Sequence, residues 1–169
     1  MWLAMPALAQ APDSAAAAGP TDPQIAAIVV AANQVDVDAA KLATSRTKNK
    51  DVKTFAELMI RDHNGVNKQA KALCKKLKVT PEENATSKSL TDGGKENMAT
   101  LKKLKGAEFD KAYVDHEVAY HQQVLDAINN TLIPNAKNAD LKALLEKVAP
   151  VIQAHLDHAK KMQSDLAAK

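Results

Sequence analysis

Four long stretches of the chain carry apolar residues at alternating spacings of three and four residues, and this pattern constrains the fold more than any other feature. That spacing places the apolar side chains on one face of an α-helix, which has about 3.6 residues per turn. A single face of this kind is too narrow to make a helix stable alone in water, so the helices must pack around a shared core. The stretches cover residues 21–46, 52–77, 108–132 and 141–166. We therefore predict an all-α fold, an antiparallel four-helix bundle.

The connections between these stretches are short, except for the middle one. Residues 21–23 (Thr-Asp-Pro) form a typical helix start, and Pro81 ends the second helix because proline has no backbone N–H. The middle connection begins with a polar segment that contains two adjacent glycines, residues 82–94, which we interpret as a loop. It continues with a short extra helix over 95–104. Pro150 falls inside the last helix, where we expect a bend or an unpaired carbonyl.

The composition argues against most other classes of fold and function. Only 3% of the residues are aromatic and only 5 are glycine, whereas sandwiches, barrels and nucleotide-binding α/β folds need glycine turns and β-branched strands. The one cysteine, Cys74, excludes a disulfide framework. The net charge of +3 arises from 23 basic and 20 acidic residues, which argues against nucleic-acid binding. No apolar run approaches the roughly 18 residues that would span a membrane. The length of the chain is typical of a single domain, which we predict over residues 22–167.

The first residues are similar to the end of an export signal. Residues 7–9 (Ala-Leu-Ala) fit the small-x-small pattern that signal peptidase reads. The basic beginning of such a signal is missing and the apolar part is short. We therefore interpret residues 1–21 as the remnant of a signal that starts upstream, followed by a linker rich in Ala, Pro and Ser. This interpretation predicts an exported, soluble protein of the periplasm.

Each of the four apolar stripes is interrupted by side chains that can bind a metal ion. The interrupting residues are Asp36, His63, Glu117, His121 and His155. Counting residues from the connecting turns places these side chains at similar heights along the axis of the bundle. His121 comes 15 residues before Ala136, the centre of the last turn, and His155 comes 19 after it, which is a difference of about 6 Å at about 1.5 Å per residue. Asp36 and His63 are likewise 13 and 14 residues from the turn between the first two helices.

Polar groups of this kind cost about several kcal/mol each when they are buried alone, unless they are hydrogen-bonded or bind a cation. We interpret the five residues together as a metal site. The alternative is a buried network in which each histidine donates a hydrogen bond to Asp36 or Glu117. Asp62, His116 and His158 are weaker candidates, because they point away from the centres of the stripes.

Several residue patterns resemble one known family. They are Phe55-x-x-x-Met59-x-x-Asp62-His63, then Phe109-Asp110-x-x-Tyr113 with His121 eight residues later, then Pro150 with His155-Leu156 and Ala159, and Lys41-Leu42-Ala43 in the first helix. Over residues 21–166 the chain resembles domain of unknown function 4142, whose members are often labelled predicted outer-membrane proteins. The resemblance implies a ferritin-like helical fold and an exported protein, and it assigns no chemistry.

The chain departs from true ferritins in its candidate ligands. Ferritins hold two irons with a Glu and paired Glu-x-x-His motifs, and no Glu-x-x-His occurs in this sequence. In the first helix the family usually has Glu where this chain has Asp36 and Asp38. Three imidazoles favour Zn²⁺, Cu²⁺ or a single Fe or Mn ion over a di-iron pair.

Three functions agree with these features. The first is a metal-binding bundle in metal handling or envelope stress, with His63, His121 and His155 as ligands and with Glu117 or Asp36 completing the site. The second is a non-enzymatic structural or interaction protein with a buried network of histidines and carboxylates. The third is a metal-dependent oxidoreductase that acts on peroxide or superoxide. The motifs of common hydrolases do not occur, so we favour a protein that is not an enzyme and leave self-association open.

Overall fold

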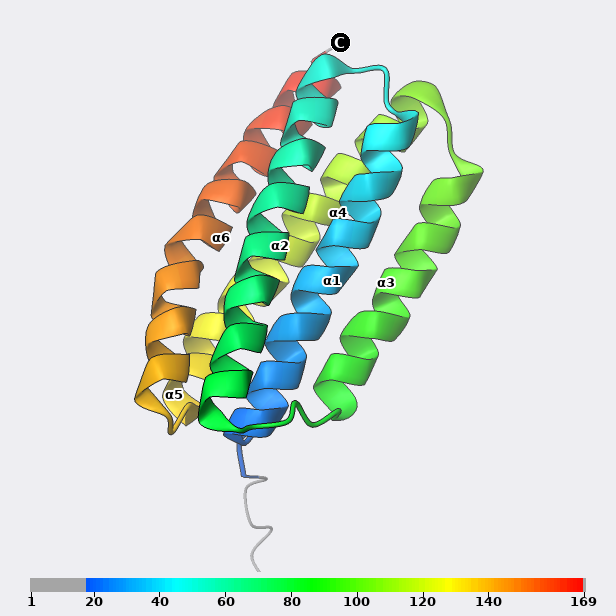
Figure 1. The fold of residues 1–169 in the computed structure, drawn as a ribbon. Helices are drawn as coiled ribbons and strands as arrows, with labels where there is room; N and C mark the ends of the chain where they lie inside the picture. Colours follow the sequence, from blue (N-terminus) through cyan, green and yellow to red (C-terminus); the bar gives the residue numbers. More distant parts are fainter. Residues whose placement is uncertain (1–17, 169) are drawn as a thin grey trace, which may run out of the picture.

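The computed structural model describes residues 18–168 and shows an all-helical protein (Figure 1). Its five long helices are α1 (Asp22–Arg46), α2 (Lys50–Leu77), α3 (Ala85–Lys103), α4 (Gly106–Ala127) and α6 (Ala139–Ala167). A π-helical segment, η1 (Ile128–Leu132), and the short α5 (Ile133–Asn135) follow α4 directly. The all-α class is confirmed, and the part from residue 18 to residue 168 contains no strand. Most of the expected export remnant, residues 1–17, lies outside the described residues.

Side chains at the helix starts explain most of the helix boundaries. Thr21 accepts a hydrogen bond from the backbone N–H of Gln24, and the Gln24 side chain accepts one from the backbone N–H of Thr21. This reciprocal pair is a capping box. Asn49, Asn84 and Asn138 start α2, α3 and α6, and each accepts bonds from two backbone N–H groups of the first turn. These caps satisfy donors that the first turn of a helix otherwise leaves without partners.

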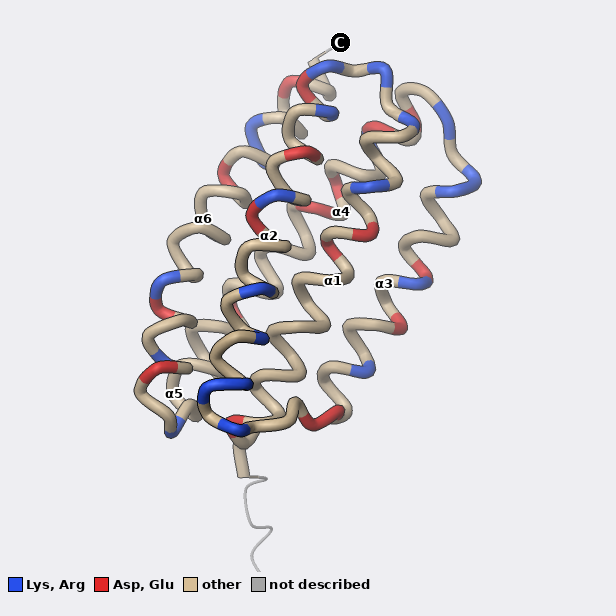
Figure 2. The backbone as a smooth tube through the Cα atoms, viewed as in Figure 1, with Lys and Arg blue, Asp and Glu red and all other residues tan. Residues whose placement is uncertain are grey.

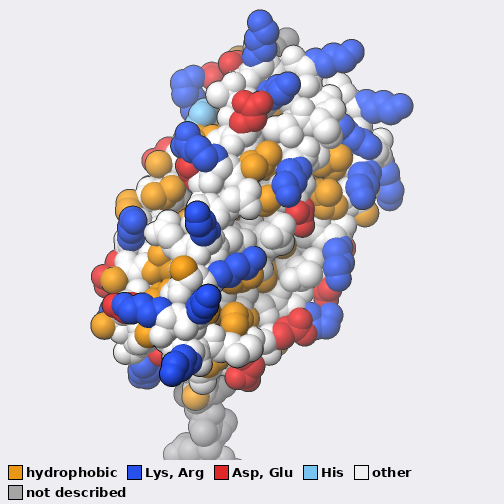
Figure 3. Space-filling view, in the orientation of Figure 1, with side chains coloured by type: hydrophobic (Ala, Val, Ile, Leu, Met, Phe, Trp, Pro, Cys, Tyr) orange, Lys and Arg blue, Asp and Glu red, His pale blue; other side chains and the backbone are white. Residues whose placement is uncertain are grey.

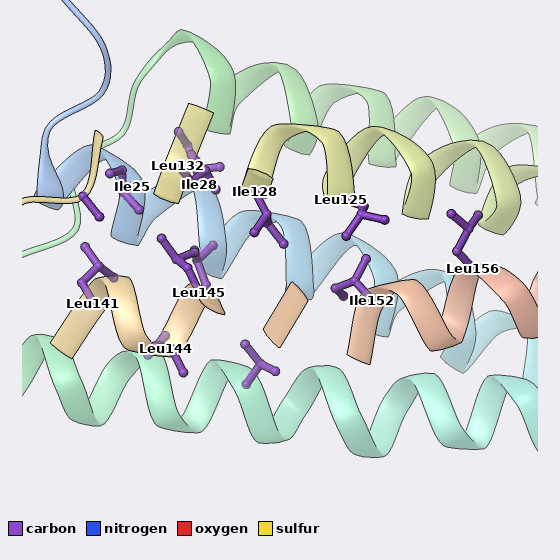
Figure 4. Close-up of a cluster of buried hydrophobic side chains, with 14 residues drawn as sticks. Ile25, Ile28, Leu125, Ile128, Leu132, Leu141, Leu144, Leu145, Ile152 and Leu156 are labelled. Carbon is purple, nitrogen blue, oxygen red and sulfur yellow. The ribbon is translucent and has the colours of Figure 1, made fainter. Parts of the chain in front are cut away.

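Helices α1, α2, α4 and α6 surround the core, and α3 lies outside them against α1 (Figure 1). α1 packs along α2 and α4 packs along α6, while contacts of α2 with α6 and of α1 with α4 close the ring. The core has two apolar clusters. The leucine cluster includes Ile25, Leu125, Leu145 and Ile152 (Figure 4), and the aromatic cluster includes Phe55, Leu101, Phe109 and Tyr113. Along α1, α2 and α4, the candidate metal ligands lie between these two clusters, and on α6 His155 lies at the end of the leucine cluster.

Charged residues of both signs are distributed along the helices (Figure 2). On the face shown in Figure 3, apolar side chains are visible between the charged ones. The lysine–carboxylate pairs of this surface, such as Lys76 and Asp140 at 2.8 Å, are exposed and so contribute little to stability. Among the described helices, none has an apolar stretch of the length needed to cross a membrane.

The prediction of a loop over residues 82–94 is wrong for most of that segment. α3 begins directly after Asn84, whose side chain caps it, and it continues through both glycines. Glycine weakens an isolated helix, but Gly94 faces α1, where a Cβ atom would lie only 2.7 Å from Val35 Cγ2. The glycine therefore lets α3 approach α1 closely. As a result, the chain has a fifth long helix that the prediction of a four-helix bundle with a short extra helix does not include.

Gly94→Ala is expected to lower the free energy of unfolding by about 1–3 kcal/mol, because the added methyl group must displace Val35. Gly93→Ala is the matched control. Nothing lies within 4 Å of a Cβ atom at that position, so this substitution is expected to stabilise the protein by roughly 0.5–1 kcal/mol. Unfolding of both variants in denaturant measures the difference. Equal stability of the two variants would contradict the close contact between α1 and α3.

Candidate metal centre

Five buried polar side chains from four helices come together in the middle of the bundle. They are Asp36 of α1, His63 of α2, Glu117 and His121 of α4, and His155 of α6. None of them is more than 4% exposed. The ring centroids of the three histidines lie 5.3 to 5.5 Å apart. The structure thus brings together all five of the principal residues that the sequence predicts, and we call them the ligand cluster.

One ring nitrogen of His63 is bound to a fixed acceptor. His63 Nδ1 lies 2.7 Å from Asn33 Oδ1, and Asn33 donates from Nδ2 to the backbone oxygen of Val29, also at 2.7 Å. This second bond orients the amide, so that its oxygen, which can only accept, faces the ring. His63 therefore donates from Nδ1, and its Nε2 carries the lone pair.

The other two histidines are held in a similar manner. His121 Nδ1 lies 3.0 Å from the backbone oxygen of Glu117, and His155 Nε2 lies 3.0 Å from Asp62 Oδ2. Both oxygens accept, so these two ring nitrogens donate, and the lone pairs are on His121 Nε2 and His155 Nδ1. Histidines that bind metals are commonly oriented in this way, by a hydrogen bond from the nitrogen that does not bind the ion.

The three nitrogens with lone pairs, His63 Nε2, His121 Nε2 and His155 Nδ1, are buried and have no hydrogen-bond partner. Such groups are rare in folded proteins, because each unsatisfied one costs about 1–3 kcal/mol. One ligand atom from each of the three histidines lies within 4.8 Å of the others. A single metal ion could therefore be the partner of all three.

Asp36 adds a carboxylate to the three imidazoles. Its Oδ2 lies 3.2 Å from His63 Nε2 and 3.5 Å from His121 Nε2, and neither of its oxygens has a hydrogen-bond partner. Two ligands that are each about 2.0–2.1 Å from a tetrahedral ion lie about 3.3 Å from each other. The observed separations are therefore close to those of ligands that share one ion. Although Asp36 is shorter than the Glu that the family usually has, it reaches the cluster.

Glu117 is the second acid of the cluster. Its Oε2 lies 3.4 Å from His121 Nδ1, and both of its carboxylate oxygens are without a hydrogen-bond partner. Burial, together with the charge of Asp36, raises the pKa of Glu117 well above its ordinary value. Burial also raises the pKa of Asp36, and the nearby His121 and His155 offset this only in part. Burial therefore shifts both acids toward their protonated forms.

Burial keeps two of the histidines neutral. It lowers the pKa of His63 to about 3, and the neighbouring His155 acts in the same direction. It lowers the pKa of His121 to about 4, against the attraction of Asp36. Neutral imidazole is the form that binds a metal ion. Both rings can therefore bind an ion at neutral pH without first losing a proton.

Asp62, one of the weaker candidates, touches the cluster through His155 and not directly. Arg61 Nε holds its carboxylate at 2.7 Å. Partial burial raises the pKa of Asp62, but the hydrogen bonds from Arg61 and His155 outweigh this effect and leave the pKa below its ordinary value. Asp62 thus stays ionised and orients His155. Asn33 has the corresponding role for His63 and is missing from the sequence prediction, although its place three residues before Asp36 puts it on the same helix face.

His116 and His158, the other weaker candidates, lie outside the cluster. The ring of His116 stacks on that of Tyr120, with centroids 5.4 Å apart. The ring of His158 is edge-on to Phe55, with centroids 5.0 Å apart. Both histidines therefore pack against aromatic rings and do not join the other three.

The sequence matches the family described as domain of unknown function (DUF4142) over residues 7–162. Because the match covers most of the chain, the protein belongs to this family, as its residue patterns predict. No protein of curated function matches the sequence. The fold is similar to a solved structure described as CopM in the Cu(II)-bound form, with a TM-score of 0.68 and 17% identity, over 86% of this chain and 98% of that one. At this level of identity the likeness concerns the fold alone.

Proposed function

We propose that this DUF4142 protein binds one divalent metal ion through His63, His121 and His155, with Asp36 as the fourth ligand and Glu117 beside it. One observation carries the proposal. Each imidazole donates from one nitrogen to a fixed acceptor and keeps its other nitrogen buried without a partner. In a network of hydrogen bonds, the two acids would pair with these nitrogens. Here Asp36 Oδ2 lies within 3.2 to 3.5 Å of His63 Nε2 and His121 Nε2, and neither contact is a hydrogen bond.

Copper(II) is the first candidate for the ion, and zinc(II) is the second. Imidazole suits both, and among divalent first-row ions copper binds most tightly to a given set of nitrogen and oxygen ligands. The similar solved structure is described as Cu(II)-bound, which adds support. Iron also suits imidazole but binds less tightly, and manganese prefers oxygen ligands.

We infer that the protein handles metal ions outside the cytoplasm, in storage, transfer or protection from metal stress. The export interpretation of residues 1–21 supports this location. Every proposed ligand is exposed to 4% or less. Such deep burial favours a site that retains its ion over a site that exchanges it rapidly.

The proposal is tested by elemental analysis and melting curves of protein purified without a histidine tag. About one ion per chain is expected, because the two groups of possible ligands, one with the three histidines and one with the two acids, share His121. An ion present at about 1,000 times its Kd stabilises the folded state by about 4 kcal/mol, so a chelator is expected to lower the Tm by roughly 8–16 °C for a domain of this size.

A structural protein without a metal is the alternative, and the same experiment separates the two. In that case the purified protein takes up no copper or zinc, and the chelator leaves the melting curve unchanged. Either of these results would refute the proposed metal site.

A further inference from the structure

A cavity of about 90 Å³ lies beside the ligand cluster, within the leucine cluster. At one end it touches Asp36, His63 and His121. Most of the rest of its lining is aliphatic, and the exceptions are Asn33, Thr86, Tyr120 and Gln123. The aliphatic part includes Ile28, Ile128, Leu132, Leu144, Leu145 and Ile152 (Figure 4). Holding a metal ion in the ligand cluster does not require this space.

Two irregular helical segments border the cavity. η1 is π-helical and contributes Ile128 and Leu132 to the lining. In α6, Pro150 lies between the lining residues Val148 and Ile152, and proline removes one backbone hydrogen bond of a helix. π-helical turns are rare and occur frequently at functional sites. Both irregular segments thus border the same cavity.

We propose that this cavity binds a small, neutral, apolar molecule of the size of dioxygen, directly beside His63 and His121. An engineered apolar cavity of about 150 Å³ in another protein stays dry and binds benzene or xenon. A cavity of about 90 Å³ therefore admits a molecule of two or three heavy atoms. Delivery of dioxygen to an ion held by the histidines rests on the proposed function, whereas binding in the cavity does not.

The aliphatic lining distinguishes dioxygen from related polar molecules. Peroxide and superoxide would lose their hydration on entering. Although Asn33, Tyr120 and the unpaired nitrogens of His63 and His121 offer some hydrogen-bond partners, most of the lining is aliphatic. Dioxygen has little hydration to lose. The cavity therefore favours dioxygen over the two substrates that the oxidoreductase hypothesis names.

A path leads to the cavity from the surface. Thr86 of α3 and Gln123 of α4 are exposed and also line it. The entrance therefore lies between the first turn of α3 and the second half of α4, where these two helices make few contacts. A small molecule can enter there without passing through the charged exterior of α2 and α6.

The test uses dissolved dioxygen as the probe and metal-free wild-type protein. Dioxygen is paramagnetic and accelerates the relaxation of methyl protons that it approaches. The methyl groups of Ile28, Leu145 and Ile152 are expected to show a several-fold larger acceleration than those of Val52 and Val114. These two valines are fully buried in the aromatic cluster and do not line the cavity. Equal acceleration in the two groups would overturn the proposal.

Two variants of α4 make the test specific. Val124 and Val118 are both half-buried, and of the two only Val124 lines the cavity. Val124→Phe is expected to remove the additional acceleration, and Val118→Phe is expected to keep it. If Val124→Phe does not fold, Ala127→Leu fills the cavity from the next turn of α4. Persistence of the acceleration in a folded filling variant would refute the proposal.

The failure of this proposal is distinguishable from that of the proposed metal site, because the protein is metal-free in the relaxation experiment. Dioxygen contact with no uptake of copper or zinc would refute only the metal site. Metal uptake with no preferential dioxygen contact would refute only the cavity site.

Discussion

Replacing His121 with alanine is expected to weaken the binding of copper(II) or zinc(II) at least about 100-fold. The loss of a residue that only orients a ligand already weakens metal binding by about 10- to 100-fold, and His121 is itself one of the proposed ligands. Its Nε2 lies 3.5 Å from Asp36 Oδ2, and its ring centroid is 5.5 Å from those of His63 and His155. Competition with a chelator of known affinity measures the change.

His116→Ala is the matched control for this prediction. It removes the same kind of side chain from the same helix, but the His116 ring stacks on Tyr120 outside the ligand cluster. Its metal affinity is expected to equal that of the native protein. Unchanged metal affinity in His121→Ala would refute the ligand assignment. An equal loss of metal affinity in both variants would indicate that the substitutions disturb α4 as a whole.

Glu117→Gln is expected to stabilise the metal-free protein at pH 7. The pKa of Glu117 is raised by burial and by Asp36, so its stabilising contribution is complete only below its ordinary pKa of 4.5 and is lost as the pH rises through the raised value. Glutamine does not titrate and avoids this loss. The gain is about 1.4 kcal/mol for each pH unit between the ordinary pKa and the raised one, and only the units below pH 7 count at that pH. Unfolding in urea at pH 7 and at pH 4.5 measures it, and the gain is expected to disappear at the lower pH.

Addition of copper(II) or zinc(II) is expected to reverse this order, because an ionised carboxylate stabilises a nearby cation more than an amide does. Glu57→Gln is the control. Glu57 lies on the exposed face of α2, so its replacement removes the same charge and is expected to change stability by less than about 0.5 kcal/mol at either pH. If the metal-free Glu117→Gln protein is less stable than the native protein at pH 7, the buried Glu117 does not lower the free energy of unfolding as we expect.

The ligand cluster could be predicted from the sequence because two regularities combine there. The helical period assigns Asp36, His63 and His155 to inward faces. Short turns then determine the height of each residue, since the rise per residue in a helix is constant. Only three residues, 47–49, separate α1 from α2, so counting from that turn accumulates little error.

The outer helix α3 could not be predicted in this way. Only three of its residues are buried, Ser87, Gly94 and Leu101, because it packs on the outside of α1 and not in the core. Close packing there requires small side chains, and small polar residues and glycines are also typical of loops. The local sequence therefore does not distinguish a helix from a loop in this segment. The close approach of Gly94 to Val35 is visible only in the structure.

Asn33 and the cavity are missing from the sequence prediction for other reasons. An asparagine on an inward face gives no sign of the direction of its amide, which depends here on the bonds with Val29 and His63. Two residues that line the cavity, Ile128 and Leu132, lie in the π-helical turn η1. Such turns are rare, and the apolar spacing of the sequence predicts an ordinary α-helix there.

The four proposed ligands come from four different helices, so the site is complete only when the whole ring of helices has assembled. Asp36 and His155 are 119 positions apart along the chain. An ion that joins these residues therefore acts as a reversible cross-link, which closes a loop that is open in the unfolded chain. The cavity beside the site is lined mainly by aliphatic side chains, which do not solvate a charged ion, so the ion leaves only when at least two helices move apart. Its residence time is then governed by the kinetic stability of the bundle more than by the strength of any one bond.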